Sequence, residues 1–145
     1  YYAWFREKEV AMFILGKPNT FKYCNYKKQK LKGFDFNLGR SLHKIPKSEK
    51  VSLVDKSDPE HWYIKSWNPQ NNELKMLIEC MRGQEDYCWT PDGRILMGSK
   101  GALFIYDPQK GDKVWKKLGD LGIGTFQRLA CSPKGDMIAL VVNKN

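Results

Sequence analysis

Apolar and polar residues alternate in short runs along the whole chain, and residues that favour turns separate the runs. Runs of about four to eight residues bounded by such turns are typical of β-strands. No segment keeps the 3.6-residue apolar period of an amphipathic helix over about ten residues. The pattern therefore predicts an all-β fold.

The turn between two apolar runs recurs at a nearly constant interval. Pro91 and Pro133 each lie in a Ser/Thr-Pro-x-Gly turn, and they are 42 residues apart. Pro46 lies 45 residues before Pro91 in a third copy, and Arg6 takes the place of the proline 40 residues before Pro46. The chain is therefore a repeat with a period of about 42 residues.

Each copy of the motif predicts a β-hairpin. Proline presets φ at the second position of the turn, and a glycine with positive φ closes it. We therefore expect positive φ at Gly93 and Gly135.

Further apolar runs follow each hairpin, and Pro69 and Pro108 mark two of them at an offset of 39 residues. The predicted third strands of the units are 19–25, 63–70 and 103–109, and the predicted fourth strands are 30–36, 73–80 and 113–118. Four strands in 40 to 45 residues are typical of a β-propeller blade. We also expect all five tryptophans to lie in strands and to pack between blades.

The fold expected is thus an all-β, partial β-propeller domain over residues 1–145. It contains about three and a half four-stranded blades, and we expect it to be part of a longer, six-bladed propeller. The predicted blades are 1–38, 39–83 and 84–125, followed by a final hairpin at 126–145. Unpaired strand edges predict that the isolated chain self-associates or needs the rest of the propeller.

The two best copies, around Pro91-Asp92-Gly93 and Pro133-Lys134-Gly135, resemble the repeat of TolB-like propellers, a WD40-like repeat. Proteins of that family are six-bladed, periplasmic and bind protein partners. The resemblance implies a non-catalytic scaffold that is periplasmic or secreted. No signal peptide is visible, and the longest apolar runs, Val10–Leu15 and Met137–Val142, are too short to span a bilayer.

The sequence offers no catalytic or cofactor motif. It has no Gly-x-Ser-x-Gly nucleophile turn, no phosphate-binding Gly-Lys-Ser/Thr loop and no His-x-x-x-His pair. Its four cysteines lack the close spacing of a structural zinc site, so we interpret them as free thiols, although disulfides stay open. We expect no enzyme activity, no metal and no cofactor.

Binding surfaces of propellers are formed by loops and strand starts at the mouth of the central channel. The candidate partner-binding residues at these positions are Arg40, His43, Glu85, Asp86 and Arg128. This mixture of charges predicts a protein or a small polar ligand as partner. The competing interpretation is a packed histidine and a solvated loop end with no ligand.

The positive charge of the chain suggests another partner. The net charge is +9, and the first 50 residues carry 12 basic against 4 acidic residues. Lysines 22, 27, 28, 30 and 32 alternate there with aromatic residues. One alternative function is therefore binding of nucleic acid or an anionic surface through the hairpin 22–32. No nucleic-acid motif surrounds these lysines, and the competing interpretation is a solvated hairpin.

A further alternative is the accessory propeller of a prolyl-oligopeptidase-type peptidase. Such a propeller would gate access to a separate catalytic domain and would carry no catalytic residue itself.

Overall fold

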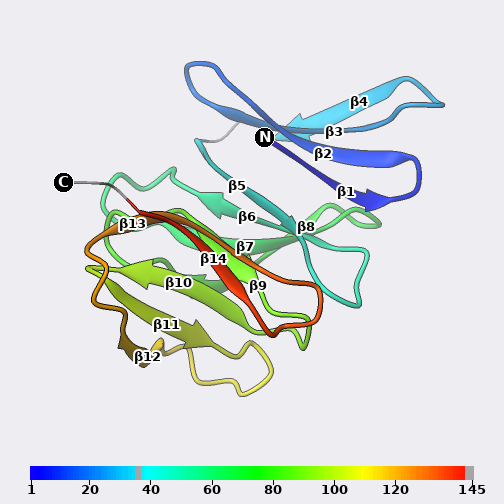
Figure 1. Ribbon diagram of the computed structural model, residues 1–145. Helices are drawn as coiled ribbons and strands as arrows, with labels where there is room; N and C mark the ends of the chain where they lie inside the picture. The colour runs from blue at the N-terminus through cyan, green and yellow to red at the C-terminus, as the bar shows by residue number, and fades with distance from the viewer. Residues whose placement is uncertain (35–36, 143–145) are drawn as a thin grey trace. The chain divides into compact units, whose positions relative to one another are not determined.

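The computed structural model describes residues 1–34 and 37–142, and of Lys30 it describes the backbone alone. In this part of the chain fourteen β-strands form four antiparallel sheets, and no helix occurs (Figure 1). The described residues accordingly contain no helix that could cross a membrane. The all-β prediction is confirmed. The chain divides into two compact units, Tyr1–Glu85 and Asp86–Asn145.

The first unit contains two four-stranded sheets. In each sheet consecutive strands pair in chain order, which is the meander expected of a blade. The first sheet is β1 (Tyr2–Arg6), β2 (Glu9–Ile14), β3 (Thr20–Asn25) and β4 (Lys30–Phe34). The second sheet is β5 (Leu38–Lys44), β6 (Val51–Asp55), β7 (Tyr63–Asn68) and β8 (Glu73–Glu79).

The second unit contains a four-stranded sheet and a two-stranded sheet. The third sheet of the chain is β9 (Tyr87–Trp89), β10 (Ile95–Ser99), β11 (Ala102–Tyr106) and β12 (Lys116–Asp120). The fourth sheet is the hairpin of β13 (Phe126–Cys131) and β14 (Ile138–Val142). Three complete meanders and one hairpin match the predicted content of about three and a half blades.

One predicted strand boundary differs from the observed one, and others fall on residues that the structure does not describe. The fourth strand of the third unit begins at Lys116 and not at residue 113, because the connection from β11 takes up residues 107–115. Residues 35–36 of the predicted strand 30–36, and residues 143–145 of the final hairpin 126–145, lie outside the described residues. The division into blades at 38, 83 and 125 stays a prediction, as does the total of six blades.

The two glycine turns have the predicted geometry. Gly93 has φ of 93° and Gly135 has φ of 77°. The Gly93 N–H donates to the Thr90 carbonyl at 3.0 Å, and the Gly135 N–H donates to the Ser132 carbonyl at 3.0 Å. Both turns therefore close as predicted.

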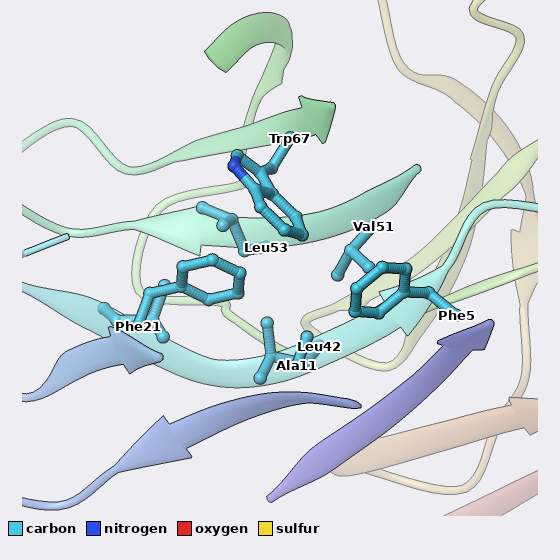
Figure 2. Packing of buried hydrophobic residues seen from close by; sticks show 8 residues of the cluster. Phe5, Ala11, Phe21, Leu42, Val51, Leu53 and Trp67 are labelled. Atoms are coloured by element: carbon cyan, nitrogen blue, oxygen red, sulfur yellow. The ribbon is translucent and has the colours of Figure 1, made fainter. Parts of the chain in front are cut away.

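Aromatic residues from both sheets form the core of the first unit. Figure 2 shows Phe5 and Phe21, from the first sheet, beside Trp67 of the second sheet. The ring centroids lie 5.6 Å apart for Phe5–Trp67 and 5.0 Å apart for Phe21–Trp67, both edge-to-face. Leu42 on β5 and Leu53 on β6 belong to the same buried cluster. The two sheets are thus held together as adjacent layers of one core.

In the second unit the hairpin packs on the third sheet through one close approach. Phe126 on β13 joins Leu129, Cys88 and Leu96 in a buried cluster. Its ring lies directly over Gly98 on β10, where a Cβ would overlap the ring carbons. Glycine at this position therefore lets the two sheets pack closely.

The prediction for the tryptophans is only partly correct. Trp62 precedes β7 and Trp115 precedes β12, so neither lies in a strand. Trp4 lies in β1 but about half of its surface is exposed. Trp67 is completely buried and packs between two sheets as predicted. Aromatic content alone did not separate core positions from surface and loop positions.

Candidate functional site

The start of β5 holds the carboxylate of Glu85. The Arg40 N–H donates to Glu85 Oε2 at 3.1 Å, and Arg40 Nε lies 3.4 Å from Glu85 Oε1. The preceding residue is Gly39, where a Cβ would stand 2.7 Å from Glu85 Oε2 and 2.9 Å from Val54 Cβ. The absence of a side chain at Gly39 therefore lets the carboxylate lie against the β5 backbone.

A second cation completes the group. Lys56 Nζ lies 3.5 Å from Glu85 Oε2 and 3.7 Å from the centroid of the Trp62 ring. The Lys56 N–H donates to the Asn37 carbonyl at 2.7 Å, which fixes the segment that follows β6. An ammonium over an indole face gains cation–π attraction. We call Arg40, Lys56, Trp62 and Glu85 the Glu85 cluster.

The Glu85 cluster brings charges of both signs together. Two cations, Arg40 and Lys56, flank the carboxylate of Glu85. All three side chains are partly buried, so their fields are screened less than those of fully solvated charges. Such a group of charges favours a strongly polar ligand group.

The thiol beside the cluster, that of Cys80, has a raised pKa. Burial, and the negative charges of Glu85 and Glu79, raise the pKa of Cys80 to about 12. Reactive cysteines are thiolates at neutral pH, whereas this thiol stays protonated.

In the described residues all four cysteines are free thiols, as interpreted from the sequence. Among the same residues no group of three or more His, Cys, Asp or Glu side chains could hold a metal ion.

The other predicted site residues are His43 in the first unit and Asp86 and Arg128 in the second unit. His43 lies on β5 three residues after Arg40, roughly 10 Å along the strand. The His43 carbonyl accepts a hydrogen bond from Ser52 Oγ at 3.3 Å. Asp86 and Arg128 belong to the second unit, where Arg128 lies opposite Val141 on the final hairpin. The structure thus joins Arg40 with Glu85, and the convergence of all five residues stays a prediction.

Sequence reasoning missed Lys56 and Trp62. They lie 29 and 23 residues before Glu85, and no spacing in the sequence links them. The sequence offered two signals: a lysine directly after the second strand of a blade, and a tryptophan directly before the third strand. Both patterns are common on protein surfaces. The sequence also did not indicate that the Glu85 carboxylate lies close to Gly39, because glycine occurs in strands for several different reasons.

The lysine-rich hairpin does not present its lysines on one face. Tyr23 lies opposite Lys32 in the β3–β4 pairing, and Lys22 lies opposite Gly33 one position further along. Directly paired residues share a face and neighbouring positions alternate, so Lys22 and Lys32 project to opposite faces of the sheet. Lys28 lies in the exposed turn. This arrangement does not favour a continuous anionic-ligand surface on the hairpin.

The comparisons with known proteins concern the fold. No family model matches the chain, and no curated protein matches its sequence. The crystal structure of TolB from Acinetobacter baumannii superposes with a TM-score of 0.68 at 14% sequence identity. The match covers 90% of this chain and 34% of that one. The chain has a TolB-like β-propeller fold. It spans about a third of the length of that TolB chain, so the likeness extends to a part of the TolB propeller.

Proposed function

We propose that this TolB-like chain is a non-catalytic scaffold that binds a protein or a small polar ligand through the Glu85 cluster. The observation that carries the proposal is the pairing of one carboxylate with two cations at the start of β5. Loops and strand ends on a rigid scaffold are common binding positions. The proposed surface also includes His43, Asp86 and Arg128.

The cations of the cluster suggest the chemistry of the partner. A carboxylate-bearing segment would meet Lys56 beside Glu85, because the lysine ammonium carries three N–H donors. An acidic peptide is therefore the ligand class we expect. By likeness to TolB-like propellers, we propose a periplasmic or secreted location. No observation favours the peptidase alternative.

Fluorescence anisotropy with two labelled peptides tests this proposal. One peptide alternates Glu with Gly and Ser, and its control carries Gln in place of every Glu. We expect saturable binding of the acidic peptide and several-fold weaker binding by Arg40→Ala. Lys44→Ala is the matched control, because it removes the same charge from an exposed position on the same strand.

The controls separate a defined site from general charge attraction. Equal weakening by Arg40→Ala and Lys44→Ala would show that only the net charge of the chain matters. Binding of the Gln peptide with the same affinity would exclude recognition of carboxylates. The melting temperature of Arg40→Ala is expected to stay close to that of the parent chain, because a partly exposed ion pair contributes about 1 kcal/mol or less.

A further inference from the structure

The loop between β6 and β7, residues 56–62, carries two members of the Glu85 cluster. Lys56 is the first residue of the loop and Trp62 is the last. The Lys56 ammonium lies 3.7 Å from the centroid of the Trp62 ring, and cation–π attraction to this ring orients the ammonium. The contacts that hold the loop in place should therefore affect binding at the cluster, even where they touch no ligand.

Backbone hydrogen bonds fix both ends of this loop. At the first end the Lys56 N–H donates to the Asn37 carbonyl at 2.7 Å, and Asn37 Nδ2 donates to the Lys56 carbonyl at 3.2 Å. At the second end the Cys80 N–H donates to the Trp62 carbonyl at 2.8 Å. The second end also has a side-chain contact, which is made by the residue before Trp62, His61.

An ion pair joins His61 to the end of β8. His61 Nδ1 lies 2.6 Å from Glu79 Oε1. Glu79 is the last residue of β8 and directly precedes Cys80. The ion pair is therefore the neighbour of the backbone hydrogen bond from Cys80 to Trp62, and both contacts hold the second end of the loop against β8.

The charges around His61 favour its protonated form. The hydrogen bond to Glu79 raises the pKa of His61, and the carboxylates of Asp58 and Glu60 within the loop add to this shift. Asp58 Oδ1 also accepts the His61 backbone N–H at 3.1 Å, which orients the residue in the loop. A hydrogen bond between two charged groups is stronger than one between neutral groups. The contact with Glu79 is therefore stronger at pH values at which His61 is protonated.

We infer that His61 is a positioning residue for the Glu85 cluster. Its ion pair with Glu79 holds Trp62 in place, so binding of an acidic peptide weakens when His61 loses its proton. This inference rests on the proposed function and adds its regulation by pH. Both partners of the ion pair are about half exposed, so we expect a modest change in affinity, of about two- to fivefold.

Titration with the Glu-containing peptide at pH 6 and at pH 8 tests the pH dependence. The Glu side chains of the peptide ionise at lower pH and carry the same charge at both values. We expect the parent chain to bind about two- to fivefold more weakly at pH 8, and we expect His61→Gln to lose this dependence. The other histidine of the chain is His43. Whatever its affinity, His43→Gln should keep the pH dependence of the parent chain, and loss of the dependence in this variant alone would overturn the inference.

Removal of the partner carboxylate separates positioning from general charge attraction. Glu79→Gln removes a negative charge, so attraction by net charge alone predicts tighter binding of the acidic peptide. The positioning role of His61 instead predicts binding about two- to fivefold weaker at pH 6. Glu73→Gln is the matched control, because it removes the same charge at the opposite end of β8 and should not weaken binding.

Hydrogen exchange of the Cys80 amide measures the loop without a ligand, because this amide donates to the Trp62 carbonyl. At pH 6 we expect faster exchange in Glu79→Gln than in Glu73→Gln, and equal rates would overturn the inference. Equal affinity of the parent chain at pH 6 and pH 8, or tighter binding by Glu79→Gln, would overturn the inference and leave the proposed function standing if binding still depends on Arg40. Absence of Arg40-dependent binding would overturn both.

Discussion

The contact between Gly98 and Phe126 offers a sharp test of how the final hairpin packs. A Cβ at position 98 would stand 2.8 Å from Phe126 Cδ2, and closer still to Cε2 and Cζ. Carbon atoms in contact prefer about 3.5–4.0 Å, so Gly98→Ala requires the ring to move by roughly 1 Å or more. Phe126 is buried among Cys88 and Leu129, which limits such a movement.

The expected cost of Gly98→Ala follows from two opposing effects. Overpacking of a well-packed core destabilises by about 1–3 kcal/mol. Alanine in a strand recovers about 0.5–1 kcal/mol relative to glycine through the unfolded state. Because the overlap is with a confined ring, we expect a net loss of about 1–2 kcal/mol in the free energy of unfolding.

Urea denaturation followed by far-ultraviolet circular dichroism measures this loss. Gly119→Ala on β12 is the matched control, because no heavy atom lies within 4 Å of its Cβ position. We expect Gly119→Ala to be neutral or slightly stabilising. In a Phe126→Leu background the cost of Gly98→Ala should fall, because the smaller side chain leaves room. Equal effects of Gly98→Ala and Gly119→Ala would refute the packing described here.

Three further predictions concern local features. Gly93→Val should lower the free energy of unfolding by about 1 kcal/mol or more, because a β-branched residue is strained at positive φ. Urea denaturation measures this loss, and an unchanged free energy of unfolding would contradict the turn geometry. The hydrogen bond to Glu79 raises the pKa of His61 in the folded chain. Protonated His61 therefore stabilises the folded state, fully so at pH values below the pKa that His61 has in the unfolded chain. This stabilisation is lost as the pH rises through the pKa of the folded chain. An NMR titration should show a lower His61 midpoint in Glu79→Gln, and an unchanged midpoint would exclude the interaction. Burial raises the pKa of Cys80 and of Cys88 to about 12. We therefore expect thiol reagents at pH 8 to modify both cysteines only after unfolding, which mass spectrometry can show. Rapid labelling of the native chain would contradict their burial.

Much of the fold could be predicted from the sequence because its signals are local. The turns at Gly93 and Gly135 combine proline with a glycine of positive φ, and each turn sets the register of its own hairpin. The start of β12 was harder to predict, since Lys116 and Lys117 continue the polar connection from β11 without a change in pattern. Long polar connections leave strand boundaries undefined until pairing partners are known.

The candidate site could be predicted only in part because its contacts join distant segments. Arg40 and Glu85 were predicted from their positions at the start of a strand and in the loop before the next blade, and the two side chains meet. Lys56 and Trp62 join them through the loop between β6 and β7, whose path depends on the packing of the whole sheet. The spacing of these residues along the sequence does not show that their side chains come into contact.

We propose that the Glu85 cluster, and not the lysine-rich hairpin, binds an acidic partner. NMR chemical-shift mapping of the isotope-labelled chain, titrated with the Glu-containing peptide, distinguishes these two sites. We expect the largest saturable shifts on the amides of Arg40, Lys56, Glu85 and Asp86, and on the indole N–H of Trp62. Shifts concentrated on residues 22–32, with those amides unchanged, would refute binding at the Glu85 cluster and assign it to the hairpin.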